Sequence, residues 1–290
     1  MTDGVCRVGG VEVHYAEHGK GLPLIALHGA GVDHRELESA LEPALAERGG
    51  HRRVYVDLPG MGRTPAPEHL TSNDDVVDLL VRFVDELAAG GPFLLLGHSY
   101  GAYLARAVAA ERVNRAVGLA LLCPVGETSR DLPTDPVTRV EGDPHALLEP
   151  EQVPGFDDYF VVRTPATARR YRDADLPGTL LADETALGRV FTRWALRPRP
   201  EERARYPHPT LILTGRQDTS AGFAAASDLL AHYPRATAAV LDDAGHALPH
   251  ERPALLAAFL DDWLERAGGQ AESVGEGHPG LSQSRDSAGA

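Results

Sequence analysis

The sequence predicts an α/β protein in which helices flank a mostly parallel, doubly wound sheet and a helical cap is inserted above the sheet. Apolar runs that do not alternate with polar residues recur along the chain, as in strands covered on both faces. Helical patterns separate these runs, and strands that alternate with helices form right-handed βαβ units. A chain of 290 residues, 43% of them hydrophobic, is long enough for one large domain with an insertion.

Seven segments are expected to form strands. Residues 11–15 alternate between apolar and polar side chains, as in a half-exposed strand. The other six are short apolar runs at 22–27, 53–56, 93–96, 116–123, 210–213 and 238–241. The clearest helices lie at 76–87, behind an acidic first turn, and from Pro253 to a stop at Gly268.

The same pattern divides the chain into a core and an insertion. Residues 1–123 and 206–267 form the predicted core domain. Residues 124–205 are rich in Pro, Asp, Glu and Arg, and they are interpreted as a helical cap or lid. Such an insertion lies at the carboxyl ends of the strands, where ligands bind in open α/β sheets. Residues 268–290 have almost no apolar side chains, so a disordered tail is expected.

Charge and composition exclude several classes of function. The net charge of −14 argues against a nucleic-acid groove or an anionic membrane surface. Lys20 is the only lysine and lies in a glycine turn, which leaves no buried lysine for a Schiff base and no Walker-type phosphate loop. Neither the two cysteines, Cys6 and Cys123, nor the 13 histidines have metal-ligand spacing. We therefore expect no cofactor and no metal.

The cellular location follows from similar observations. Two distant cysteines predict no disulfide framework, which fits a reducing compartment. Residues 1–5 lack the features of a signal peptide. The longest apolar stretch, 116–123, is shorter than the about 20 residues that a membrane helix needs. A soluble cytoplasmic protein that acts on a small molecule is expected, and its oligomeric state stays open.

A candidate nucleophile lies in the pentapeptide Gly-His-Ser-Tyr-Gly at 97–101. The pentapeptide follows the apolar run 93–96 and precedes an alanine-rich helix, so its serine lies on a sharp strand-to-helix turn. Such a turn strains the serine backbone and requires tiny neighbours two residues away, which Gly97 and Gly101 provide. The pattern alone is common by chance, but in this context Ser99 is interpreted as a catalytic nucleophile.

A serine nucleophile needs a base, and the base needs an acid that orients it. Asp218 follows the strand at 210–213 and His246 follows the strand at 238–241, so both are expected at the edge of the sheet that carries Ser99. A lone histidine is more often structural, but a Gly-His pair after a terminal strand favours a base. The competing acids are Asp242, Asp243 and, in reserve, Asp131.

With this order of residues, the chain resembles the α/β-hydrolase-fold enzymes over about residues 10–267. The resemblance implies that the sheet is an α/β-hydrolase sheet. It also implies that the protein belongs to the branch of the family with a serine nucleophile, which is esterase- or lactonase-like. It also implies that Ser99 is the nucleophile, Asp218 the acid and His246 the base.

The resemblance further implies an oxyanion hole made of backbone N–H groups, those of Ala30 and Tyr100. Loss of one such donor typically lowers the rate about 10²–10³-fold. His28 is expected to brace the loop that carries Ala30, and it is also a candidate substrate contact. Arg193 and Trp194 of the cap could clamp a substrate carboxylate, although an arginine there is more often a solvated surface charge.

A serine nucleophile beside an oxyanion hole performs acyl transfer through an acyl-enzyme intermediate. Hydrolysis of a carboxylic ester, thioester or lactone of a small molecule is the first interpretation. Family members that cleave C–C bonds usually carry tryptophan after the base, where this chain has Ala247. A C–C bond hydrolase, or another acyl-transfer or lyase activity on the same triad, is therefore the alternative enzyme. A hydrolase-like receptor for a small ligand is the alternative without catalysis. His98 and His250 are expected to be structural.

Overall fold

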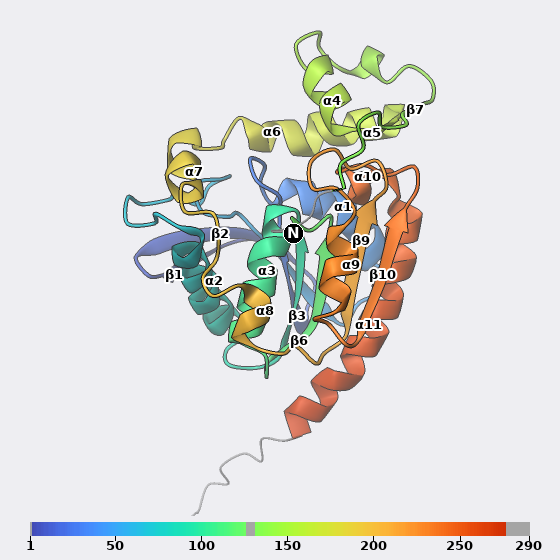
Figure 1. Cartoon of the computed structure of the whole chain (residues 1–290). Helices are drawn as coiled ribbons and strands as arrows, with labels where there is room; N and C mark the ends of the chain where they lie inside the picture. Colours follow the sequence, from blue (N-terminus) through green and yellow to red (C-terminus); the bar gives the residue numbers. More distant parts are fainter. Residues whose placement is uncertain (1, 126–130, 277–290) are drawn as a thin grey trace, which may run out of the picture.

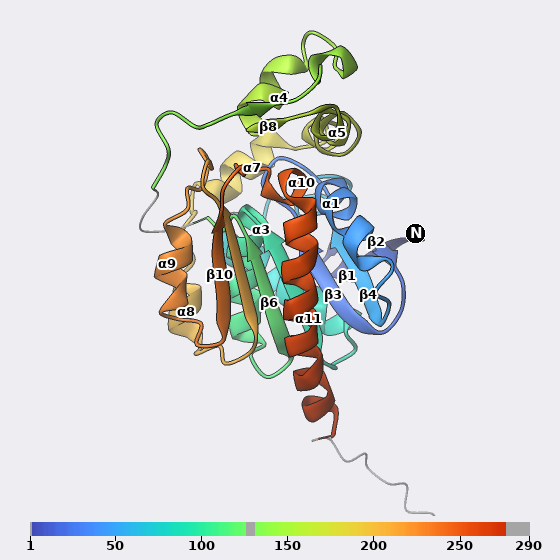
Figure 2. The same cartoon turned by 90° about the vertical axis from the view of Figure 1, so that its right-hand side faces the viewer.

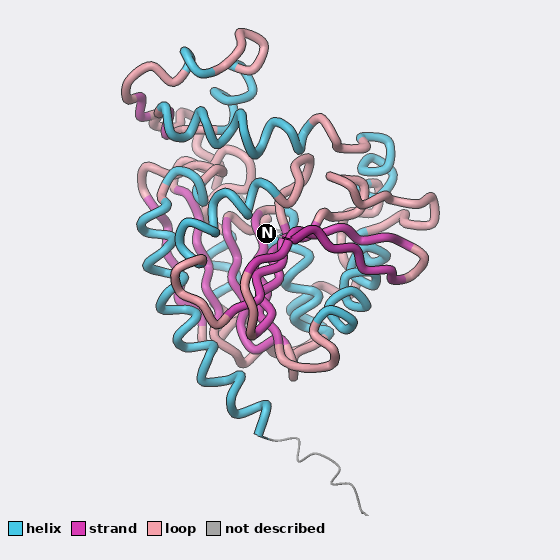
Figure 3. Tube along the Cα trace, turned by 180° about the vertical axis from the view of Figure 1, so that it is seen from behind, coloured by secondary structure: helices cyan, strands magenta, loops and turns pink. Residues whose placement is uncertain are grey.

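The computed structural model describes residues 2–125 and 131–276. An eight-stranded sheet runs through the protein, with helices on both faces (Figures 1 and 3). β1, β2 and β4 pair antiparallel, and from β4 to β10 all neighbouring strands are parallel, which confirms the predicted α/β sheet. In sheet order the strands are β1 (Thr2–Val8), β2 (Val11–His18), β4 (His51–Val56), β3 (Leu22–Leu27), β5 (Phe93–His98), β6 (Ala116–Leu122), β9 (Thr210–Gly215) and β10 (Ala236–Leu241).

Helices form one layer on each face of the sheet (Figure 2). Helices α1, α10 and α11 pack on one face, and α2, α3 and α9 pack on the other. Phe93 and Leu95 of β5 pack against the second layer, whereas Leu94 and Leu96 pack against the first, so the run 93–96 is buried on both faces of the sheet. The bounds are α1 (Arg35–Leu45), α2 (Asn73–Leu87), α3 (Tyr100–Glu111), α9 (Ala225–Leu230), α10 (Leu248–Glu251) and α11 (Pro253–Glu276).

Local sequence explains how α2 and α3 are placed. The side chain of Ser72 caps α2 by accepting a hydrogen bond from the N–H of Asp75 at 3.2 Å. Residues 100–110 of α3 are all buried, and many of them are alanine. Because alanine adds little width to the helix, α3 can lie close against β5.

The segment between β6 and β9 is called the cap here. Its elements from β7 to α6 lie above the carboxyl ends of the parallel strands, whereas α8 lies lower, beside α3 (Figures 1 and 2). Helix α5, a π-helical segment η2 and helix α6 follow one another without a break and cross above the sheet. The elements of this segment are β7 (Arg139–Val140), η1 (His145–Leu147), α4 (Val153–Tyr159), β8 (Val162–Arg163), α5 (Pro165–Arg170), η2 (Tyr171–Asp175), α6 (Leu176–Thr179), α7 (Glu184–Phe191) and α8 (Pro200–Arg203).

The structure differs from the predicted elements at both ends of the chain. β1 was not predicted, because only Val8 of its residues is buried and its exposed side chains give no apolar pattern. α11 does not stop at Gly268 but continues to Glu276, since a glycine inside a helix costs only about 1 kcal/mol. The helix therefore covers part of the predicted tail, and residues 277–290, like 126–130 of the cap, lie outside the described residues.

None of the helices within residues 2–125 and 131–276 combines the length and the apolar character that crossing a membrane requires.

Candidate active site

Ser99 lies on the turn between β5 and α3, in a strained backbone conformation. Its φ of +51° and ψ of −114° are outside the regions that residues with a side chain favour. A Cβ atom on Gly101 would overlap the carbonyl oxygen of Leu27, and one on Gly97 would overlap the backbone of Ala102. The two glycines therefore allow the turn, which brings the Ser99 hydroxyl to the carboxyl end of β5.

Three side chains from separate loops form a hydrogen-bonded chain. Ser99 Oγ lies 2.9 Å from His246 Nε2, and Asp218 Oδ2 lies 2.9 Å from His246 Nδ1. The other carboxylate oxygen, Oδ1, accepts hydrogen bonds from the backbone N–H groups of Ser220 and Ala221, both at 2.8 Å. Asp218 is fully buried, whereas 12% of the His246 side chain is exposed.

The electrostatics of this chain favour one tautomer of the histidine. Burial opposes ionisation of Asp218, but His246 and the two backbone donors outweigh it and hold the pKa of Asp218 below its ordinary value. The ionised carboxylate accepts a hydrogen bond from the N–H at Nδ1 of His246, so the ring proton stays on Nδ1. Nε2 is then left to accept the proton of the Ser99 hydroxyl.

The competing acids of the sequence do not contact His246. Asp242 and Asp131 are exposed. Asp243 forms an ion pair of 3.2 Å with an arginine of β7. Among the residues that the structure describes, Asp218 is the carboxylate bonded to the His246 ring.

Two backbone N–H groups near Ser99 are available to a ligand. In the loop after β3, Gly29 N–H donates to a carboxylate at 2.9 Å and Gly31 N–H to a methionine sulfur at 3.1 Å. The N–H of Ala30 lies between them. The N–H of Tyr100 is in the first turn of α3, where helical N–H groups have no intrahelical acceptor. Neither N–H has a hydrogen-bond partner within residues 2–125 and 131–276.

A cavity of about 460 Å³ lies above these groups, within the range of pockets that bind small molecules. The cap covers the cavity from above and the core forms its floor. The lining of the cavity includes Ala30, Ser99 and His246 of the core and Tyr159, Tyr171 and Asp175 of the cap. The reactive groups are thus enclosed in a site with room for a small substrate.

A buried ion pair, which the sequence did not indicate, supports the site from below. Glu36 accepts hydrogen bonds from Gly29 N–H at 2.9 Å and from the Tyr159 hydroxyl at 3.2 Å, and its Oε1 lies 2.6 Å from Nδ1 of His98. Nε2 of His98 lies 2.9 Å from the carbonyl oxygen of His246. Burial opposes both charges, but the mutual attraction outweighs it, so the pKa of Glu36 is lowered and that of His98 is raised. An acid in the first turn of a helix is common, which hid this role in the sequence.

A second unpredicted acid, Glu251 of α10, joins the cap to the loop that carries the histidine. Its carboxylate accepts hydrogen bonds from the backbone N–H groups of Val161 at 2.7 Å, Val162 at 2.9 Å and Gly245 at 2.6 Å. Gly245 directly precedes His246. Because all three partners are backbone groups, and two of them lie 89 and 90 positions away in the chain, no sequence pattern could have revealed these contacts.

His28 does not contact the cavity, which corrects its prediction as a substrate contact. Its side chain is fully buried, with Nδ1 2.7 Å from the carbonyl oxygen of Gly29 and Nε2 accepting a hydrogen bond of 3.0 Å from Leu58 N–H. Both ring nitrogens are therefore used within the protein. His28 braces the loop that carries Ala30.

Arg193 and Trp194 also lie away from the cavity, so the expected carboxylate clamp is corrected as well. The Trp194 ring stacks on Tyr103 of α3 with the ring centroids 5.4 Å apart. The Arg193 side chain is 64% exposed, and its Nε donates to the carbonyl oxygen of Thr71 at 3.2 Å. Aromatic stacking and backbone contacts thus hold this segment beside α2 and α3 and not above Ser99.

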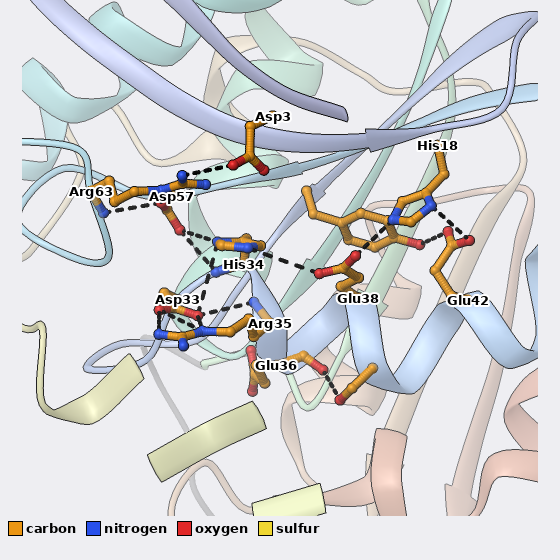
Figure 4. Close-up of polar contacts among 12 residues, drawn as sticks. Asp3, His18, Asp33, His34, Arg35, Glu36, Glu38, Glu42, Asp57 and Arg63 are labelled. Carbon is orange, nitrogen blue, oxygen red and sulfur yellow. Dashed lines mark hydrogen bonds and ion pairs between the residues drawn. The ribbon is translucent and has the colours of Figure 1, made fainter. Parts of the chain in front are cut away.

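Within residues 2–125 and 131–276, two clusters bring possible metal ligands within 4.8 Å of one another: His98, Cys123 and His246, and Asp33, His34 and Asp57. In the first, both ring nitrogens of His246 already contact the serine and the aspartate. In the second, His34 Nδ1 lies 2.7 Å from Asp57 and Asp33 pairs with Arg35 (Figure 4). Burial opposes the charge on Asp57, but His34 outweighs it and lowers the pKa to about 2. Protein donors thus occupy these carboxylates, and we assign the second cluster a structural role.

Comparisons with known proteins identify relatives over most of the chain. A model of the alpha/beta hydrolase family matches residues 24–259. The 2-hydroxy-6-oxo-6-(2'-aminophenyl)hexa-2,4-dienoic acid hydrolase of Metapseudomonas resinovorans is 27% identical over 220 residues, which cover 73% of each chain. The 2-hydroxymuconate semialdehyde hydrolase of Pseudomonas sp. (strain CF600) is 26% identical and covers 91% of this chain and 94% of that protein. The crystal structure of an alpha/beta superfamily hydrolase from Oenococcus oeni PSU-1 superposes with a TM-score of 0.83 at 26% identity, over 92% of this chain and all of that one.

Proposed function

Because this chain belongs to the alpha/beta hydrolase family, we propose that it hydrolyses a carboxylic ester, thioester or lactone of a small molecule through an acyl-enzyme on Ser99. One observation carries the proposal. The Ser99 hydroxyl is hydrogen-bonded to His246, whose other ring nitrogen is hydrogen-bonded to buried Asp218. This arrangement activates a hydroxyl at neutral pH without another group.

The proposed reaction begins when Ser99 Oγ attacks the substrate carbonyl carbon and His246 Nε2 takes the hydroxyl proton. The carbonyl oxygen becomes an oxyanion that accepts hydrogen bonds from the N–H groups of Ala30 and Tyr100. His246 then returns the proton to the leaving alcohol or thiol, and the acyl group stays on Ser99. Water attacks the acyl-enzyme by the same steps, which releases the acid and regenerates the serine. Asp218 stabilises the charged histidine in each step.

Hydrolysis of a C–C bond is the second candidate, and the relatives favour it. The names of the two curated hydrolases denote a hexadienoic acid and a semialdehyde, which contain no ester. Their reaction requires a carbon leaving group, which must be protonated before it departs. In this chain the residue after the base is Ala247, which is fully buried and packs with Phe156 and Phe160 of the cap. Family members that cleave C–C bonds usually carry tryptophan at this position, so the alanine supports hydrolysis of an ester over hydrolysis of a C–C bond.

The test is the release of nitrophenolate from p-nitrophenyl acetate and butyrate by the wild type, Ser99→Ala and Ser227→Ala. Ser227 is an exposed serine of α9, so its variant is the matched control. We expect a burst of acyl-enzyme followed by turnover in the wild type and the control, and neither in Ser99→Ala. Tight binding of a small ligand without turnover of any ester by the wild type would favour a receptor instead.

A further inference from the structure

The cavity contains a carboxylate that the proposed reaction does not use. Asp175 ends the π-helical segment η2, where Leu176 N–H donates to the carbonyl oxygen of Tyr171 five residues earlier. Only 2% of Asp175 is exposed, and it lines the same cavity as Ser99 and His246. Single π turns within helices occur frequently at functional sites, because the extra residue redirects the side chains that follow.

Neither oxygen of the Asp175 carboxylate has a hydrogen-bond donor within residues 2–125 and 131–276. The basic group closest to it is His250, whose Nε2 lies 3.4 Å from Oδ1 without forming a hydrogen bond. Burial raises the pKa of Asp175, and His250 opposes this shift only in part. A buried carboxylate without donors is unfavourable unless another molecule supplies them.

The other charged groups of the cavity do not fill this role. Glu36, the second carboxylate in the lining, already has Gly29 N–H, the Tyr159 hydroxyl and His98 as partners. Among the described residues that line the cavity there is no arginine or lysine. The charged His98, which also lines the cavity, is already paired with Glu36. A substrate that carries a carboxylate would therefore meet the like charge of Asp175 and no unpaired positive group in this lining, whereas a cation would meet Asp175.

We propose that Asp175 is a specificity-determining residue that binds an ammonium group of the substrate, so that the preferred substrates are esters or thioesters carrying an amine. This inference rests on the proposed ester hydrolysis at Ser99. An ammonium group supplies both the hydrogen-bond donors and the charge that the carboxylate lacks, and hydrogen bonds between charged partners are the stronger kind. The names of the two curated relatives denote a carboxylic acid that carries an aminophenyl group and a muconate semialdehyde, so both of those compounds carry a carboxylate.

The test compares p-nitrophenyl esters that match in shape. The alanine ester is measured against the lactate and 2-methylpropanoate esters, and the 6-aminohexanoate ester against the heptanoate ester. In the wild type, kcat/KM for at least one amino ester is expected to exceed that of its uncharged partner about tenfold or more. Asp175→Asn should remove this preference and leave the uncharged esters within about threefold of the wild type. Asp173→Asn, an exposed acid of the same π turn, is the matched control and should keep the preference.

A measurement on the wild type alone covers the case in which Asp175→Asn fails to fold. Butylammonium should inhibit hydrolysis of p-nitrophenyl acetate competitively, and butyrate and butanol should inhibit it less. Equal or stronger inhibition by butyrate would overturn the role of Asp175. A lactate ester whose kcat/KM exceeds that of the 2-methylpropanoate ester by as much as the alanine ester's does would also overturn it. An Asp175→Asn variant that slows all esters equally would also overturn it. In these three outcomes ester hydrolysis itself stands, whereas a wild type that hydrolyses none of the esters contradicts the proposed function.

Discussion

Replacing Asp218 by asparagine tests how the structure sets the tautomer of His246. Oδ1 of Asp218 accepts hydrogen bonds from the N–H groups of Ser220 and Ala221. The oxygen of an asparagine must occupy this position, so its NH₂ group faces Nδ1 of His246 and forces the proton onto Nε2. A ring protonated at Nε2 cannot accept the proton of Ser99.

The magnitude follows from the alternative orientation. Turning the asparagine so that its oxygen faces His246 leaves two N–H donors unpaired, that of Ala221 buried and that of Ser220 partly buried, at a cost of roughly 1–3 kcal/mol each. The sum of about 2–6 kcal/mol corresponds to a loss of roughly 30-fold to 10⁴-fold in kcat. A loss near 10⁴-fold is typical when the orienting aspartate of such a triad becomes asparagine.

The assay is the initial rate of p-nitrophenyl butyrate hydrolysis, with circular dichroism and a urea midpoint to verify folding. Asp242→Asn, at an exposed acid close to His246 in the sequence, is the matched control and should keep the wild-type rate. A folded Asp218→Asn variant that loses less than about tenfold would refute the tautomer argument. An equal loss in Asp242→Asn would refute the assignment of the acid.

Three further outcomes follow from the described contacts. In urea unfolding, Glu36→Gln should lose roughly 3–5 kcal/mol of stability relative to the wild type where both members of the buried pair are charged. Folding lowers the pKa of Glu36 and raises that of His98. The stability difference is therefore largest between pH 4.5 and 6.5, the ordinary pKa values of these two groups. The difference should shrink as the pH rises through the raised pKa of His98. Gly101→Ala should destabilise the fold by at least about 2 kcal/mol, whereas Gly188→Ala, where a Cβ would enter open space in a helix, should stabilise it by about 0.5–1 kcal/mol; equal midpoints would contradict the steric argument. Arg193→Ala should leave kcat/KM for esters within about twofold of the wild type. A larger loss would support the hypothesis that Arg193 contacts a substrate carboxylate.

The core could be read from the sequence because its constraints are local or periodic. The buried run 93–96 contributes side chains to both layers of helices, and such a run has few structures other than a covered strand. The requirement for glycine at Gly97 and Gly101 comes from atoms within the same turn and the adjoining strand. The positions of Asp218 and His246 follow from the rule that parallel strands end at one edge.

The contacts that the sequence did not reveal join residues that no periodic pattern relates. Glu36 and His98 are 62 positions apart, and each alone resembles a common residue of a helix start or a strand end. Trp194 in the cap suggested a ligand contact, but a large aromatic side chain gains as much from stacking on Tyr103. Composition could not distinguish these two outcomes, because both bury the same ring.

The orientation of the Asp175 side chain shows why the substrate preference is harder to predict from the sequence than the reaction. Residues 171–175 hold two acids, and a regular helix would rotate each residue by about 100° from the one before it. One extra residue in a turn shifts every later side chain by a similar angle, so the acid that faces the cavity depends on whether the turn is π or α. In this cap the π turn leaves Asp173 exposed and places Asp175 in the cavity lining. Insertion or removal of one residue in this turn would change which side chain faces the cavity, while Ser99 and its partners stayed in place. A cap can therefore change the substrate preference without any change in the reacting groups.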